Sequence, residues 1–270
     1  MKAMIFAAGL GTRLRPVTDT IPKALLPIAG KTLLQYQVEK LAAAGIKDIV
    51  INVHHFADQI VDYLCVNHNF GCNIAISDER AQLLDTGGGL RRAAAFLQDD
   101  CCLACNVDIV SNIDIRQLIT THDKNTLATL VVSERTTQRY LLFDRNGRMR
   151  GWTNIATGEV KPISLNADHY LKLAFSGMQI LSPHIFSKME AVAKEKGDKF
   201  SVIDLYLSLC PTEQIKAYTP PDYRMMDVGK IEQLSEAERF IMALHDDQCN
   251  HNTNRRAIIY YGSTQRPMQP

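Results

Sequence analysis

Basic side chains follow a glycine-rich turn near the start of the chain, where residues 1–27 read MKAMIFAAGLGTRLRPVTDTIPKALLP. The apolar run Ala3–Ala8 predicts a buried strand. Glycines 9 and 11 let the backbone approach a bulky anion, whose oxygens accept hydrogen bonds from successive N–H groups. Positive charge stands behind this loop at Arg13, Arg15 and Lys23. Gly-x-Gly alone is also typical of tight turns, but with these cations the segment predicts a polyphosphate site.

A second glycine-rich segment, Leu84–Leu90, reads LDTGGGL. Three consecutive glycines before a helix expected at Leu90–Leu97 are costly in conformational entropy unless something approaches the backbone closely. A flexible turn is the alternative interpretation. Beside the first loop, the segment favours a base or ribose packed against its backbone.

Two aspartates separated by more than a hundred residues follow short apolar runs. Asp108 comes after the strand expected at Cys101–Cys105, and Asp227 comes after Met225 and Met226. Mg²⁺ is commonly held by one or two carboxylates, with water and phosphate oxygens as its other ligands. Asp108 could instead form a turn or a helix cap. Together the two carboxylates predict a Mg²⁺ site.

Other candidates carry weaker signals. Gly177 lies inside the strand expected at Leu171–Leu181, where it indicates either a sugar ring resting on the backbone or a bulge. Trp152 is interpreted as a cover for a sugar or as core. His54 and His55 have no accompanying nucleophile or carboxylate pattern, so a structural role is expected.

The 270 residues are 46% hydrophobic and 22% charged, with a net charge of +1. This balance is typical of globular proteins and argues against a strongly basic nucleic-acid surface. No apolar run is long enough to span a membrane. The seven cysteines show no regular framework, and Cys102-x-x-Cys105 lacks a second zinc ligand pair. We therefore expect reduced thiols and a cytoplasmic protein without nucleic-acid or membrane partners; a homo-oligomer is left open.

Strand and helix patterns alternate through the first half of the chain. This predicts an α/β fold, with a Rossmann-like, mixed and mostly parallel sheet flanked by helices. Ligands then bind beyond the carboxyl ends of the strands. After residue 138 a hairpin signal at Asn146-Gly147 predicts a smaller β-lobe. The expected divisions are one domain over 1–245, with a nucleotide-binding half at 1–137 and a sugar-binding part at 138–230, and a polar tail at 246–270.

The motifs resemble those of the sugar-phosphate nucleotidyltransferase family over residues 1–244. The matching pieces are AAGLGTRLRPVTDTIPKALLP, DTGGG, NVD, FSG and DVG, in the family's order. The resemblance implies the nucleotide-diphospho-sugar transferase fold and assigns roles to individual positions. It implies nucleotide contacts at Ala7, Ala8, Gly9, Gly11, Thr12, Arg13, Lys23, Thr86, Gly87 and Gly88. It further implies catalytic roles for Arg13 and Lys23, Mg²⁺ ligation by Asp108 and Asp227, and sugar contacts at Asn154 and Gly177.

Two positions depart from the family's pattern. Val107 stands where a glycine commonly precedes the first metal aspartate, and Thr153-Asn154 replaces a sugar-facing Glu-Lys pair. The expected reaction joins a nucleoside triphosphate to a sugar 1-phosphate and releases pyrophosphate. UTP is the first choice of nucleotide, with GTP and mannose or heptose 1-phosphate as the alternative. A non-catalytic nucleotide-sugar sensor is another alternative, whereas a kinase would need a G-x-x-x-x-G-K-[ST] loop that is missing.

Overall fold

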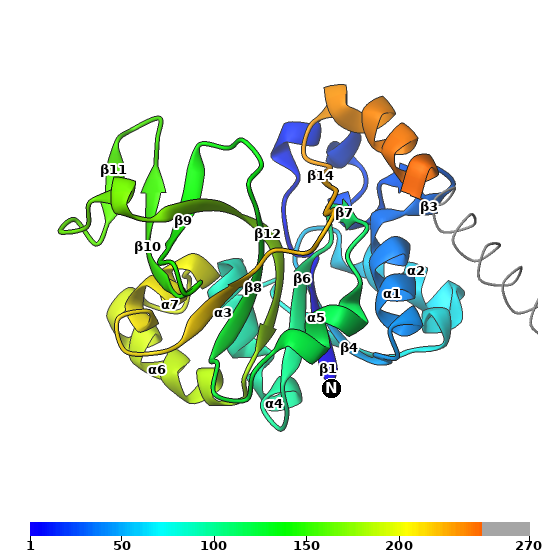
Figure 1. The fold of residues 1–270 in the computed structure, drawn as a ribbon. Helices are drawn as coiled ribbons and strands as arrows, with labels where there is room; N and C mark the ends of the chain where they lie inside the picture. The colour runs from blue at the N-terminus through cyan, green and yellow to red at the C-terminus, as the bar shows by residue number, and fades with distance from the viewer. Residues whose placement is uncertain (245–270) are drawn as a thin grey trace, which may run out of the picture.

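The computed structural model describes residues 1–244. Its centre is a mixed sheet of ten strands with helices on both faces (Figure 1). Eight of the strands follow the order β11-β10-β9-β12-β6-β1-β4-β5, and β8 and β13 branch from β12. The expected α/β class with a mixed sheet is confirmed. The predicted tail at 246–270 lies outside the described residues.

The first half of the chain supplies four parallel strands, β1 (Lys2–Phe6), β4 (Asp48–Val53), β5 (Asn73–Asp78) and β6 (Cys102–Asn106). Alternate residues of β1 enter two hydrophobic cores, with Ile5 on one face of the sheet and Met4 on the other. Helices cover both faces, which explains why the inner strands β1, β4 and β6 are mostly apolar, whereas the edge strand β5 also carries Asn73, Ser77 and Asp78. These helices are α1 (Leu33–Ala43), α2 (Ala57–Val66), α3 (Asp85–Arg92), α4 (Ala94–Leu97) and α5 (Ile115–Thr121).

The long strand β12 (Leu171–Leu181) joins this parallel half to an antiparallel one. It pairs with β8 (Ala128–Ser133) and with β9 (Arg139–Phe143). The hairpin of β9 and β10 (Met149–Asn154) turns around Gly147, as the sequence predicts, and β11 (Glu159–Lys161) extends it. In Figure 1 these strands form a lobe to one side of the parallel strands. The remaining elements of this half are α6 (His184–Lys196), α7 (Val202–Leu209) and β13 (Ile215–Tyr218).

A short two-stranded ribbon joins the middle of the sequence to a segment near residue 226. β14 (Met225–Asp227) pairs antiparallel with β7 (Ile109–Ser111). A final helix at 234–244 then packs on the first core through Ala237, Ile241 and Leu244. The smaller elements are β2 (Pro27–Ile28), β3 (Lys31–Thr32) and the 3-10 segments Thr12–Leu14, Val17–Asp19, Lys23–Leu25, His68–Gly71, Ala167–His169 and Ile231–Gln233.

One local prediction is wrong. The three glycines were expected before a helix at Leu90–Leu97, but Gly87–Gly89 lie inside α3, which ends at Arg92. Glycine is unfavourable in a helix interior, so the sequence pattern favours a turn where tertiary packing imposes a helix.

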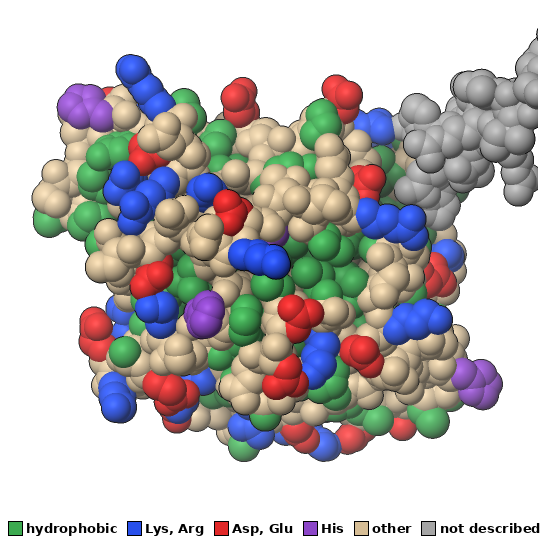
Figure 2. All heavy atoms as spheres, turned by 60° about the horizontal axis from the view of Figure 1, so that its bottom comes forward, with side chains coloured by type: hydrophobic (Ala, Val, Ile, Leu, Met, Phe, Trp, Pro, Cys, Tyr) green, Lys and Arg blue, Asp and Glu red, His purple; other side chains and the backbone are tan. Residues whose placement is uncertain are grey.

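The described surface carries both signs of charge. In Figure 2 acidic and basic side chains are interspersed around a patch of hydrophobic side chains on the face shown. Among residues 1–244, no helix combines the length and the apolar character that crossing a bilayer requires.

Candidate functional site

A cavity of about 330 Å³ opens at the carboxyl ends of the parallel strands. Strand ends of β1, β4 and β6 contribute Phe6, Asn52 and Asn106 to its lining, and α3 contributes Thr86. The sheet topology therefore brings segments from four separate parts of the sequence around one space. This is where ligands bind in open α/β sheets.

The glycine loop forms one wall of this cavity. Gly11 has a φ of +64°, and a Cβ there would lie 2.9 Å from the Cγ2 of Thr18. A side chain at 11 is thus excluded twice, by backbone conformation and by space. Gly9 differs, because nothing lies within 4 Å of a Cβ built at that position. The space beside Gly9 is open to a ligand.

The backbone N–H groups of Ala7 and Ala8 already have an acceptor. Both donate to Oδ1 of Asn52, at 2.7 and 3.3 Å. Ala7 and Ala8 line the cavity, but these N–H groups bind a side chain of β4. Donors for a phosphate must therefore come from farther along the loop, from Gly9 onward.

Lys23 lies at the floor of the site and is only 8% exposed. Its ammonium group forms an ion pair with the Asp108 carboxylate. Pairing of this kind offsets the cost of burying an ammonium group. The structure thus places a cation and a carboxylate in direct contact beside the glycine loop.

Asp227 reaches the same place through the β7–β14 ribbon. It is in register with Ile109, and the N–H of Val228 donates to the carbonyl of Asp108 at 2.9 Å. Burial is the largest cause that raises the pKa of Asp227, and the negative charge of Asp108 raises it further. The positive charges of Lys23, Arg13 and Arg135 oppose this increase. The two predicted carboxylates are therefore neighbours, and three cationic side chains lie close enough to act on Asp227.

The residues present suit a divalent cation. Two carboxylates that repel each other are stabilised when a cation lies between them, and oxygen ligands suit Mg²⁺. No group of three or more His, Cys, Asp and Glu side chains that could hold a metal occurs within residues 1–244. Asp108 and Asp227 would supply two oxygen ligands, and Mg²⁺ commonly keeps water and phosphate oxygens as its other ligands.

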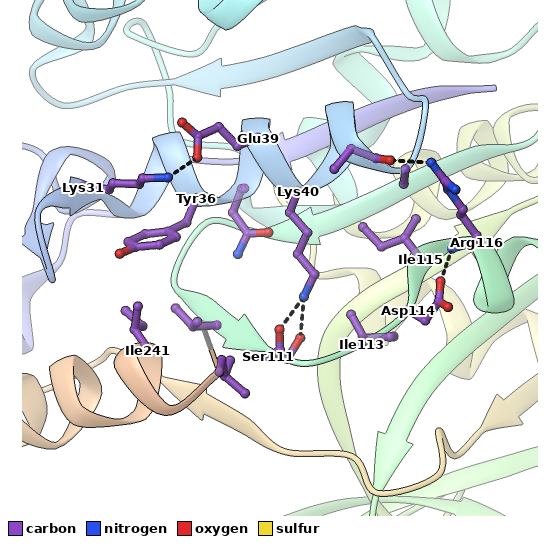
Figure 3. Close-up of a pocket in the computed structure, with 15 residues that line it drawn as sticks. Lys31, Tyr36, Glu39, Lys40, Ser111, Ile113, Asp114, Ile115, Arg116 and Ile241 are labelled. Atoms are coloured by element: carbon purple, nitrogen blue, oxygen red, sulfur yellow. Dashed lines mark hydrogen bonds and ion pairs between the residues drawn. The ribbon is translucent and has the colours of Figure 1, made fainter. Parts of the chain in front are cut away.

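Helix α1 holds strand β7 of the ribbon in place through two of its side chains. Gln37 donates to the carbonyl of Ile109, and the Lys40 ammonium donates to the carbonyl and hydroxyl oxygens of Ser111 at 2.6 and 3.1 Å (Figure 3). Burial lowers the pKa of Lys40 to about 8. A groove of about 530 Å³ runs along this side, where Ile241 of the final helix faces α1. Lys40 thereby helps to fix β7, whose neighbours carry the two carboxylates.

The triple glycine has a packing role. A Cβ on Gly87 would lie 2.4 Å from the Phe200 ring, and one on Gly88 would lie 2.2 Å from the carbonyl oxygen of Asp198. The N–H groups of both glycines donate to the Phe200 carbonyl, at 2.9 and 3.1 Å. Close contact with residues 198–200 therefore accounts for both glycines without a bound base. Thr86 does line the cavity, and its hydroxyl accepts from the N–H of Val202 at 2.9 Å.

Gly177 sits at an irregularity of β12. Pairing with β8 shifts register between Phe175 and Gln179, and Gly177 has a φ of +69°. A Cβ there would lie 2.8 Å from the Asn106 amide nitrogen. The bulge that the sequence offered as an alternative is present, and it places the Gly177 backbone against a residue that lines the cavity.

The predicted sugar residue Asn154 lies at the end of β10. Its side chain accepts from the N–H of Ala156 at 3.0 Å, which stabilises the turn to β11. Nearby, Trp152 packs partly on the core and lies under the Lys161 ammonium. The β-lobe residue Asn154 is outside the lining of the 330 Å³ cavity.

Sequence reasoning missed several polar residues of the site, namely Asn52, Glu79, Asn106, Arg135 and Lys199. Asn52 could have been noticed as the one polar residue inside the apolar stretch Ile49–Val53. Glu79 directly follows β5, at the same sheet edge. Arg135 and Lys199 lie in connecting segments and carry no local signal.

Comparisons with known proteins agree with this architecture. The family model described as nucleotidyl transferase matches residues 2–243. N-acetylmuramate alpha-1-phosphate uridylyltransferase of Caulobacter vibrioides is 44% identical over 110 residues, which cover 40% of this chain and 46% of that protein. Mannose-1-phosphate guanyltransferase of Yarrowia lipolytica is 36% identical over 136 residues, covering 49% and 37% respectively. The alignments thus span less than half the length of these two relatives.

A solved structure extends the likeness to the whole fold. A putative glucose-1-phosphate thymidylyltransferase from Bacillus anthracis superposes with a TM-score of 0.75 at 19% identity, covering 89% of this chain and 94% of that one. At this identity the match supports the fold alone. The family model spans nearly all of the described residues, and the chain therefore belongs to the nucleotidyl transferase family.

Proposed function

We propose that this protein transfers a nucleoside monophosphate from a nucleoside triphosphate to a sugar 1-phosphate and releases pyrophosphate. One observation carries the proposal: Lys23, Asp108 and Asp227 converge beside an open glycine loop at the carboxyl ends of the parallel strands. Family membership supports the same reaction class. The residues that converge are those needed to bring anions together.

The proposed reaction requires no covalent bond between the protein and its substrates. A phosphate oxygen of the sugar 1-phosphate attacks the α-phosphorus, and the bond to the departing pyrophosphate breaks. The nucleophile is already anionic at neutral pH, so no covalent enzyme intermediate is required. The barrier comes from bringing two anions into line, and such barriers are lowered by positioning and by charge stabilisation.

In this scheme Lys23 lies between the approaching oxyanions, held by Asp108 in the orientation that their ion pair defines. Arg13 and the loop N–H groups from Gly9 onward stabilise the departing pyrophosphate. Thr86 and the neighbouring backbone contact the base, and Gly177 with Asn154 faces the sugar. Asp108 and Asp227 would hold Mg²⁺, which supplies charge neutralisation at the phosphates when bound.

We propose UTP as the nucleotide and N-acetylmuramate 1-phosphate as the first sugar to test. The support is the 44% identity to the Caulobacter protein, which exceeds the 36% identity to the guanyltransferase. GTP with mannose 1-phosphate or heptose 1-phosphate is the alternative. We place the reaction in the cytoplasm, because the six cysteines among residues 1–244 are free thiols, as in reducing compartments.

The test is a matrix of the four ribonucleoside triphosphates against N-acetylmuramate, glucose, mannose and heptose 1-phosphates. Pyrophosphate release is measured with Mg²⁺ and again with EDTA. Highest turnover with UTP and N-acetylmuramate 1-phosphate supports both parts of the proposal, and a maximum with GTP and mannose 1-phosphate would reverse the substrate assignment. Nucleotide binding without pyrophosphate from any pair would point to a sensor.

A further inference from the structure

We infer that Glu79 is a positioning residue, which orients the Asn52 side chain and thereby holds the glycine loop against the segment that precedes α3. The inference rests on the proposed nucleotidyl transfer, because its effect is on nucleotide binding. Glu79 directly follows β5 and Asn52 lies in β4. The two side chains are 1% and 3% exposed, yet both border the cavity.

A continuous set of hydrogen bonds runs from one wall of the cavity to the other. The Asn52 amide nitrogen donates to Oε1 of Glu79 at 2.8 Å, while Oε2 of Glu79 accepts from the N–H of Leu84 at 3.1 Å. On its other side, Oδ1 of Asn52 accepts from Ala7 and Ala8. One buried carboxylate thus links the loop after β1 to the residues that lead into Thr86.

The donors and acceptors in this set permit only one orientation of the Asn52 amide group. Because the two backbone N–H groups at 7 and 8 can only donate, the Asn52 oxygen must face them and its nitrogen must face Glu79. Glu79 in turn must offer an acceptor to Asn52 and another to Leu84. A carboxylate does this with two oxygens, whereas a glutamine has a single oxygen.

The third glycine of α3 supports the same interpretation. A Cβ on Gly89 would lie 2.8 Å from Oε1 of Glu79 and 3.0 Å from the Asn52 amide nitrogen. The absence of a side chain at 89 leaves room for the pair. Gly87 and Gly88 pack against residues 198–200, so the triple glycine serves two separate contacts.

A buried carboxylate is expensive unless hydrogen bonds replace its hydration. Here the hydrogen bonds fix the backbone at the point where the chain leaves β1 and begins the phosphate loop. Since Ala7 and Ala8 cannot turn their N–H groups elsewhere, the N–H groups from Gly9 onward have a defined direction. We therefore expect Glu79 to affect nucleotide affinity without touching the nucleotide.

The first test is Glu79→Gln. Its side-chain NH₂ must face a donor, either Leu84 N–H or the Asn52 amide, so one hydrogen bond to a charged acceptor is lost. We expect the KM for the nucleoside triphosphate, and its dissociation constant measured by calorimetry without sugar, to rise about tenfold. The KM for the sugar 1-phosphate should change less than twofold (about 0.4 kcal/mol).

Exchanging the two functional groups provides the rescue. In the double variant Asn52→Asp/Glu79→Gln, the Asp carboxylate accepts from Ala7, Ala8 and the Gln amide, and the Gln oxygen accepts from Leu84. Every hydrogen bond is restored, with the carboxylate now at residue 52 instead of residue 79. The double variant should recover nucleotide affinity to within about threefold of the natural protein, whereas Asn52→Asp alone, with two facing carboxylates, should remain weak.

Asp78→Asn is the matched control, since Asp78 immediately precedes Glu79 and pairs with Arg80 instead. It should leave nucleotide affinity unchanged. If Glu79→Gln binds nucleotide normally, or if the double variant is no better than either single variant, the inference is wrong. An inactive natural protein would contradict the proposed function instead, and the calorimetric titrations would still test the positioning role.

A further measurement covers the case in which Glu79→Gln fails to fold. Hydrogen exchange of the natural protein, followed by NMR, should show slow exchange at the amides of Ala7, Ala8 and Leu84. Rapid exchange at all three would contradict the hydrogen-bonded link. Leu10 serves as the comparison in the same experiment, because it is exposed in the same loop.

Discussion

The cavity at the strand ends and the β-lobe differ in how their side chains are held in place. Around the 330 Å³ cavity the polar side chains of Lys23, Asn52 and Glu79 are buried and paired. In and beside the lobe, Ile155 is 55% exposed and Ile163 is 95% exposed. One region fixes its groups with buried hydrogen bonds on rigid strands, and the other presents apolar and polar side chains on turns.

This difference matches what each region would have to recognise. A triphosphate has one arrangement of charge whichever base is attached, so a rigid set of donors suits it. Sugar 1-phosphates differ in their ring substituents, and loops tolerate substitutions better than strand ends do. We therefore expect changes at the strand ends to affect the reaction as a whole and changes in the lobe to affect the choice of sugar.

The largest effect should follow from removing a carboxylate at the strand ends. Asp108→Ala or Asp227→Ala should lower Mg²⁺-dependent pyrophosphate release by about 10²–10³, comparable to losing one preorganised charge-stabilising group. Circular dichroism should be unchanged. Asp99→Ala is the control, because Asp99 pairs with Lys2 at the opposite end of β1. Near-normal turnover of either active-site variant would overturn the assignment.

Next in size is Gly88→Ala, which tests whether the triple glycine is a packing feature. Alanine normally stabilises a helix relative to glycine by about 1 kcal/mol. Here its Cβ would lie 2.2 Å from the Asp198 carbonyl oxygen, and overpacking of this kind costs about 1–3 kcal/mol. Urea unfolding should therefore show a net loss of stability.

Gly9→Ala is the counterpart to that variant. No atom lies within 4 Å of a Cβ at position 9, so the free energy of unfolding should hardly change. The KM for the nucleoside triphosphate should rise, because the added methyl group faces the open loop. If Gly88→Ala left stability intact while Gly9→Ala reduced it, the two glycine segments would have the opposite roles.

A smaller effect is expected in the lobe. Asn154→Ala should raise the KM for the sugar 1-phosphate about fivefold, equivalent to one hydrogen bond of about 1 kcal/mol. The KM for the triphosphate should stay constant. Asn146→Ala, in the turn at the other end of the same hairpin, is the control. Equal shifts for both substrates would place Asn154 in a general structural role.

The last prediction concerns the pH dependence of stability and helix α1 behind the ribbon. Burial lowers the pKa of Lys40 from 10.5 to about 8. Between these values the unfolded chain binds more protons at this lysine than the folded chain does, so its contribution to stability rises with pH. Unfolding free energies of the natural protein minus those of Lys40→Met should therefore increase from pH 8 to 10.5. A flat difference would contradict the lowered pKa.

Several elements of the fold can be predicted from the sequence. Strand β12 begins and ends where the strand pattern at Leu171–Leu181 predicts, and the Asn146-Gly147 signal correctly locates a hairpin. These features depend on neighbours along the chain, so local patterns suffice. The convergence of Asp108 and Asp227 was also predictable once both were assigned to one ion.

Other features depend on partners far away in the sequence. The helix through Gly87–Gly89 exists because residues 198–200 pack against it, more than a hundred positions later. Asn52 and Glu79 are joined across 27 residues, and neither position shows a local pattern that reveals the other. Burial and hydrogen-bond direction, which decide these contacts, become visible only in three dimensions.

The ribbon of β7 and β14 has a consequence for how the protein becomes competent during synthesis. Nearly all of the cavity lining is encoded before residue 109, but the second carboxylate arrives with β14 at Met225–Asp227. Lys199, which lines the cavity beside the segment that packs on α3, also precedes β14 along the chain. On the proposed function, a growing chain would therefore complete the walls of the cavity before it acquires the second carboxylate.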